Sequence, residues 1–145
     1  MPMKDPLVSF HFFVEAGDVQ GAFRDCAGLG SESDIVEYKA SDKDGNSVTR
    51  KVPGRVKWEN IVLKRGITDD MAIWKWRKTI EEGKVESNRR NGSIVLYNQE
   101  NTEVARWNFK DAWPSKVTGP QLNAQSNEIA IEELTLVHEG ITRDH

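Results

Sequence analysis

The chain has 145 residues, of which 37% are hydrophobic and 30% charged, as expected for one folded domain with a single core. Its net charge of −3 argues against nucleic acid as a main partner, because phosphate binding requires a clustered basic surface. The single cysteine, Cys26, excludes an internal disulfide, and no apolar run approaches the ~20 residues that span a bilayer.

The first third of the chain has the period-two pattern of β-strands. Apolar and polar residues alternate over 8–15, which predicts a strand with one strongly apolar face. A second short strand is predicted over 19–27 and ends at Gly28 and Gly30. We expect Cys26, in this strand, to be a small buried apolar residue.

A long hairpin is predicted over residues 36–53. The segment 41–47 contains no apolar residue, and Asp44-Gly45 within it is a hairpin turn signal. Pro53-Gly54 is predicted to end the second strand of the hairpin. A hairpin with little of its own to bury exposes unpaired strand edges, so we expect an arm that pairs with a neighbouring molecule.

One helix is predicted, over 69–82, after a strand over 56–65. Thr68 is a suitable N-cap, and two aspartates follow it in the first turn, where the helix dipole favours acidic groups. The spacing of Ile73, Trp76 and Ile80 predicts one buried stripe, and Gly83 is the expected stop. Trp74, two residues from Trp76, should lie on a different face of the helix.

The β pattern resumes after the helix, with strands predicted over 93–97, 103–113 and 128–139. Pro114 is predicted to end the second of these, and a bulge is expected near Glu132 and Glu133, where the apolar phase changes. The pattern predicts a mainly β fold, a barrel or sandwich of about seven or eight strands with one flanking helix. We expect a single domain over 1–145 with short flexible ends at 1–6 and 141–145.

The sequence contains no recognisable catalytic or metal-binding motif. Its three histidines, His11, His138 and His145, are not at metal-ligand spacing, and we expect two at strand surfaces and one in the tail. A nucleophile elbow, a P-loop and a dinucleotide-binding glycine pattern are all missing from the sequence. We therefore predict no catalytic, cofactor or metal residues, and a protein that is not an enzyme.

Charged residues of the hairpin and of the last strand are the candidates for contacts between subunits. The basic residues near the hairpin suit ion pairs between subunits, with a plain solvated face as the alternative. Carboxylates inside the apolar last strand need a partner, which a lysine or arginine of a neighbouring chain could supply. The candidates are Asp42, Asp44, Arg50, Lys51, Arg55, Lys57, Glu132 and Glu133.

Several short segments, in order and over residues 8–140, resemble the tail-tube protein family of contractile phages and extracellular contractile injection systems. That family is similar to the Hcp tube protein of type VI secretion. The segments are Phe12-Phe13-Val14-Glu15, Ala27-Gly28-Leu29, Ile35-Val36-Glu37-Tyr38, Lys51-Val52-Pro53-Gly54, Ile61-Val62-Leu63-Lys64-Arg65-Gly66, Trp74-Lys75-Trp76, Val104-Ala105-Arg106-Trp107, Ala112-Trp113-Pro114, Gly119-Pro120, Asn127-Glu128-Ile129-Ala130-Ile131-Glu132-Glu133-Leu134 and His138-Glu139-Gly140.

The resemblance implies a β-barrel flanked by a helix, with six copies closing into a ring and rings stacking into a hollow tube inside a contractile sheath. The hairpin at about 41–53 would reach an adjacent ring. The implied partners are further copies, the sheath protein, baseplate or spike proteins, cap-side tube proteins and possible cargo in the lumen. The implied role of a membrane is that of a target to be punctured. Residues 1–6 lack the apolar segment of a secretion signal, so we expect assembly in the bacterial cytoplasm.

Five tryptophans in so short a chain also suit a different class of protein. Tryptophan stacks on sugars and fills binding sites as well as interfaces. The alternative is therefore a soluble β-barrel module that binds a small ligand or a carbohydrate. Oligomeric state distinguishes the two hypotheses, because a binding module has no need to polymerise.

Overall fold

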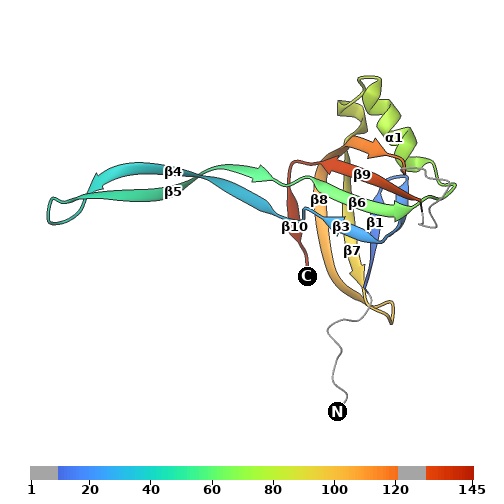
Figure 1. The fold of residues 1–145 in the computed structure, drawn as a ribbon, viewed down its shortest axis with the longest axis horizontal. Coiled ribbons are helices and arrows are strands. Elements are labelled where there is room, and N and C mark those ends of the chain that lie inside the picture. Colours follow the sequence, from blue (N-terminus) through green and yellow to red (C-terminus); the bar gives the residue numbers. More distant parts are fainter. Residues whose placement is uncertain (1–9, 121–129) are drawn as a thin grey trace, which may run out of the picture.

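A computed structural model of the protein describes residues 10–120 and 130–145, and this part of the chain is mainly β with one α-helix. The predicted fold class is confirmed (Figure 1). The elements are β1 (His11–Ala16), β2 (Val19–Phe23), β3 (Asp25–Ala27), β4 (Ser31–Ser41), β5 (Ser47–Trp58), β6 (Ile61–Gly66), α1 (Ala72–Glu81), a 3-10 turn (Glu86–Asn88), β7 (Arg90–Tyr97), β8 (Glu103–Thr118), β9 (Ile131–Val137) and β10 (Ile141–Arg143).

The main sheet has eight strands and curls around the core. Seven of them follow the order β2-β1-β7-β8-β9-β6-β3, and β10 pairs with β8 beside this path. The two outer strands, β2 and β3, are consecutive in the chain and are separated only by Arg24, whose backbone N–H donates to the carbonyl of Lys64. The predicted strand over 19–27 is therefore two strands that meet at a corner, and the sheet returns towards its own beginning.

Strand β8 is longer than predicted because Pro114 does not end it. Pro114 is fully buried and lies opposite Leu136 of β9, and the register shifts between Pro114 and Lys116. A bulge accommodates a residue that has no N–H to give to the ladder, which is why proline is tolerated here. The expected flexible end at 141–145 is also wrong in its first part, since Ile141–Arg143 forms β10 along β8.

The core fills the inside of the curled sheet. Buried side chains alternate along β9, where Glu132, Leu134 and Leu136 point inward. The β6–β9 register runs without a shift from Ile61 opposite Leu136 to Gly66 opposite Ile131. The expected bulge near Glu132 and Glu133 is therefore wrong, because the apparent change of phase is a buried glutamate occupying a core position.

Helix α1 starts three residues later than predicted. The hydroxyl of Thr68 accepts a hydrogen bond from the N–H of Asp70, and the Asp70 carboxylate accepts one from the N–H of Ala72, the first helical residue. These two contacts form successive polar turns, so Thr68 does not cap the helix. The predicted stop is confirmed: Gly83 has a φ of +83° and donates its N–H to Ile80.

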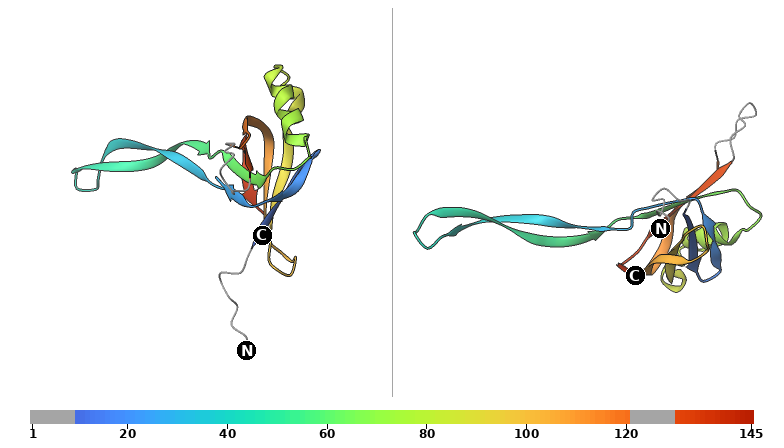
Figure 2. Two further views of the ribbon diagram at one scale, coloured as in Figure 1. Left: turned by 45° about the vertical axis from the view of Figure 1, so that its right-hand side comes forward. Right: turned by 90° about the horizontal axis from the view of Figure 1, so that it is seen from below.

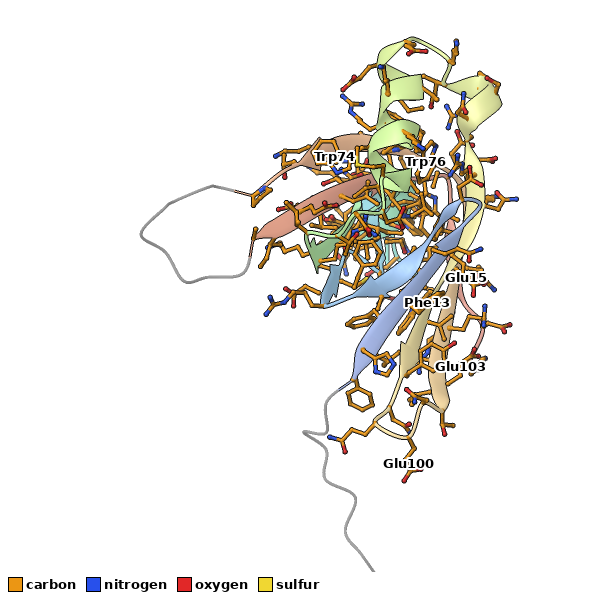
Figure 3. All side chains as sticks on the ribbon, turned by 90° about the vertical axis from the view of Figure 1, so that its right-hand side faces the viewer. Phe13, Glu15, Trp74, Trp76, Glu100 and Glu103 are labelled. Carbon is orange, nitrogen blue, oxygen red and sulfur yellow. The ribbon has the colours of Figure 1, made fainter. Side chains whose placement is uncertain are left out.

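The apolar stripe of α1 covers one end of the barrel next to β8 (Figures 1 and 3). Ile73, Trp76 and Ile80 are buried, as the spacing predicted. Trp74 and Trp76 point to different sides of the helix, and Trp74 is half-buried. Within the described ranges, no helix has the length and apolar character needed to cross a membrane.

Cys26, in the short strand β3, packs partly buried against the core, and burial raises the pKa of its thiol from 9.0 to about 12. Between these two values the unfolded chain loses a proton that the folded chain keeps, so stability falls as pH rises. We expect the wild type to lose more unfolding free energy than Cys26→Ala between pH 9 and pH 11. Urea unfolding of both proteins at several pH values measures this difference. Equal losses would contradict the burial argument.

Candidate assembly interface

Strands β4 and β5 form a separate two-stranded sheet, here called the arm (residues 31–58), which projects away from the barrel (Figures 1 and 2). The prediction of an arm over 36–53 has the right position but is too short at both ends. Pro53 and Gly54 lie inside β5 instead of ending it. Ser33 pairs with Val56 but Ile35 pairs with Pro53, so β5 contains one extra residue, and this bulge accommodates the proline.

The tip of the arm is a tight polar turn. The carboxylate of Asp42 accepts hydrogen bonds from the N–H groups of Asp44 and Asn46, at 2.9 and 2.8 Å, and Gly45 has a φ of +80°. An aspartate that closes its own turn in this way fixes the register of the two strands. Asp42, one of the predicted contact residues, therefore has a local role in the turn, and Asp44 lies beside it.

Two more of the predicted contact residues pair within the arm. The Lys57 ammonium lies 3.0 Å from the Asp34 carboxylate, and Lys51 lies 3.8 Å from Glu37. All four side chains are largely exposed, and such pairs contribute about 0–1 kcal/mol each. These ion pairs are thus available to hold the arm in shape, but they add little to its stability.

The arm exposes far more apolar surface than its polar tip suggested. Ile35 is 70% exposed, Val56 53% and Tyr38 47%, and three further large apolar residues of the arm are exposed as well. A two-stranded hairpin alone is marginally stable in water, and exposed apolar groups of this extent mark contact surfaces. The remaining three are Val36, Val52 and Trp58.

The root of the arm is held to the barrel by His138. This residue was expected at a strand surface but is buried, with Nε2 2.9 Å from the carbonyl oxygen of Glu59. Its Nδ1 accepts a hydrogen bond from the N–H of Gly140, which makes Nε2 the ring nitrogen placed to donate to the carbonyl oxygen of Glu59. Glu59 and Asn60 interrupt the predicted strand over 56–65, which is the end of β5 followed by β6.

A groove of about 610 Å³ lies beside this root. Trp58, the last residue of β5, forms part of it, so the apolar surface of the arm continues onto the barrel. The other lining residues are Asn91, Gly92, Ser93, Asn108, Phe109, Lys110, Glu139, Gly140, Ile141 and Thr142.

Glu132 finds its partner within the chain and not in a neighbouring subunit. Its carboxylate lies 3.3 Å from Nε of Arg65 on β6, and both side chains are buried. The indole N–H of Trp74 donates to the other carboxylate oxygen at 3.4 Å. Glu133, the next residue, faces outward, opposite Lys64 in the β6–β9 register. In residues 10–120 and 130–145, no group of three or more His, Cys, Asp or Glu side chains is arranged to hold a metal ion.

A family model described as T4-like virus tail tube protein gp19 matches residues 8–142. The chain belongs to this tail tube family. No curated protein sequence matches this tail tube protein. The binding-module alternative is not favoured by these findings.

Solved structures of contractile injection systems resemble this tail tube protein over nearly its whole length. A chain of the extended PVC sheath–tube complex is 30% identical, with a TM-score of 0.77, covering 96% of this chain and 90% of that one. A chain of the anti-feeding prophage tube-terminating cap is 32% identical, with a TM-score of 0.78, covering 99% and 94%. Hcp1 from Flavobacterium johnsoniae, at 13% identity, 92% and 94% coverage and a TM-score of 0.56, shares the fold.

Proposed function

We propose that this tail tube protein polymerises with copies of itself, six to a ring, into stacked rings that form the inner tube of a contractile injection system. The arm carries the contact between copies. The single observation behind this role is that the arm extends away from its own barrel with six large apolar side chains exposed. An exposed apolar surface of this extent marks a site of contact with another molecule.

The similar structures support the proposal that other proteins surround such a tube and close its ends. They come from a sheath–tube complex and from a tube-terminating cap, and a more distant one, at 19% identity, comes from a six-fold symmetrised baseplate. We propose the corresponding partners for this chain: a sheath protein outside the tube, a cap at one end and a baseplate with its spike at the other. Contraction of the sheath would drive the tube through a target membrane, with cargo in the lumen.

Ring formation would also pair strand edges that are open in a single copy. Strands β2, β3 and β10 each pair on one side only within the described chain, which leaves backbone donors and acceptors free on the other. Pairing between neighbours in a closed ring removes such edges. Contacts of this head-to-tail type close into rings, and stacking the rings gives a filament.

The test is to compare the full chain with a variant whose arm is shortened. Replacing residues 37–51 with Asn-Gly joins Val36 directly to Val52, its partner across the hairpin, through a two-residue turn. We expect rings or hollow tubes from the wild type in electron micrographs, and none from the variant. Below the assembly concentration the two thermal unfolding temperatures should agree, because the arm is separate from the core. Equal assembly of both proteins, or a monomeric wild type at every concentration, would contradict the proposal.

A further inference from the structure

The apolar residues of the arm change face half-way along it. Side chains of successive strand residues point to opposite faces, and directly paired residues share a face. In the tip half (residues 36–52) the apolar face carries Val36, Val52 and Tyr38, with Arg50 opposite Tyr38. In the barrel half (residues 31–35 and 53–58) the other face is apolar, and it carries Ile35, Pro53, Val56 and Trp58. The bulge marks the boundary.

The charged residues make the opposite change at the same place. In the tip half, the Glu37–Lys51 pair lies on the face away from Tyr38. In the barrel half, the Lys57–Asp34 pair lies on the face away from Val56. Each half of the arm therefore has one apolar face and one charged face. The apolar face of one half continues into the charged face of the other half.

The twist of the arm cancels this reversal. Near the tip β4 lies above β5, and nearer the barrel it lies below (Figure 1), so the ribbon turns its faces over between the two halves. The left view of Figure 2 shows the same exchange. Two-stranded ribbons twist strongly, and a bulge increases the local twist. Away from the boundary, Tyr38 in the tip half and Val56 and Trp58 in the barrel half thus look to one side of the molecule, the apolar side. The ion pairs look to the other, the charged side.

We propose that the apolar side of the arm, in both its tip half and its barrel half, lies against the barrel of one other copy of this chain, with the charged side facing away. This inference rests on the proposed function and adds which side of the arm contacts the other copy. It also divides the predicted contact residues: Arg50 faces the docked copy, whereas Lys51 and Lys57 do not.

Charge complementarity favours a second copy as the occupant. Residues 31–58 carry six basic and five acidic side chains, whereas the other 117 residues carry 14 basic and 18 acidic ones. The arm is slightly positive and the rest of the chain distinctly negative, so an arm is attracted to the barrel of another copy. Arg50, on the apolar side, is placed to meet one of those carboxylates.

Four single substitutions to glutamine test the orientation, two on each side. Tyr38→Gln and Val56→Gln change the apolar side in the tip and barrel halves, and Lys39→Gln and Lys57→Gln change the neighbouring residues on the charged side. We expect the first two to raise the critical concentration for ring and tube assembly about tenfold or more. The last two should change it about twofold or less. Sedimentation and electron microscopy of the full-length proteins measure this, with circular dichroism as a check of folding.

A photoreactive side chain at the same four positions gives a second readout that does not depend on loss of assembly. Positions 38 and 56 are expected to cross-link to the barrel of another copy, and positions 39 and 57 are not. Tubes in which Val56 tolerates glutamine and Lys57 does not, or in which all four variants assemble normally, would overturn the one-sided arrangement while leaving the proposed function intact. A wild type that forms neither rings nor tubes would overturn both.

Discussion

Replacing Glu132 with alanine is expected to destabilise the fold by about 3 kcal/mol, since it leaves the buried Arg65 guanidinium with only the partly exposed Asp70 carboxylate, 3.9 Å away, as a counter-charge. The Arg65 guanidinium lies 3.3 Å from Glu132, donates to the carbonyl oxygen of Asp70 at 3.2 Å and lies over the ring of Phe23 at 5.4 Å. One side chain thus joins β6, β9, β2 and the segment before α1. Urea unfolding of the chain below its assembly concentration measures the change.

Two controls separate loss of the ion pair from loss of a side chain. Glu133→Ala, on the same strand but facing outward, should change the unfolding free energy by about 0.5 kcal/mol or less. The double variant Arg65→Met/Glu132→Leu should recover most of the loss, because an apolar pair of similar volume does not need a counter-charge. A cost below about 1 kcal/mol for Glu132→Ala would show that the carboxylate does not hold Arg65 in place.

Replacing Trp76 with alanine is expected to cost about 3–5 kcal/mol, the range for deleting a buried aromatic side chain. Trp76 is 1% exposed and fills the space between α1 and the barrel. Its indole N–H donates to the carbonyl oxygen of Asn88 at 2.7 Å, and the guanidinium of Arg90 lies 4.6 Å from the ring. The substitution removes all three contacts and leaves a cavity under the helix.

Trp76→Phe is the matched control for this position. Phenylalanine keeps most of the apolar contact but cannot donate to Asn88, so the expected cost is about 1–3 kcal/mol. Thermal unfolding followed by circular dichroism gives the order of stability of the wild type, Trp76→Phe and Trp76→Ala. If alanine and phenylalanine cost the same, the hydrogen bond to Asn88 and not the packing of the ring would hold α1 in place.

The patterns that depend on near neighbours were predictable from the sequence. The stripe of Ile73, Trp76 and Ile80 follows from the helical period alone, and Gly83 stops the helix because the chain there needs a positive φ. The polar turn between the arm strands was likewise predictable, since Asp42 and Gly45 act within five residues of each other. The family was recognised from short segments in order along the chain, and the family match confirmed it.

The errors lie where a residue's role depends on a distant segment. Pro53 and Pro114 end strands by local rules, yet both lie within strands because a bulge in each pairing accommodates the missing donor. Glu132 breaks the apolar alternation of its strand when only neighbouring residues are considered, because its partner Arg65 is 67 residues away in the chain. The burial of His138 cannot be read from its neighbours, because its partner, Glu59, is 79 residues away.

The sequence by itself determined the strand periods, the helix, the hairpin turn and the family, because these depend on the order of residues within short windows. The tertiary structure alone decided which charges are buried together and which side of the arm is apolar. Cross-strand register sets the first, because it joins segments that no local pattern relates. The twist of the arm sets the second, since it brings two groups of residues on locally opposite faces to the same side in space.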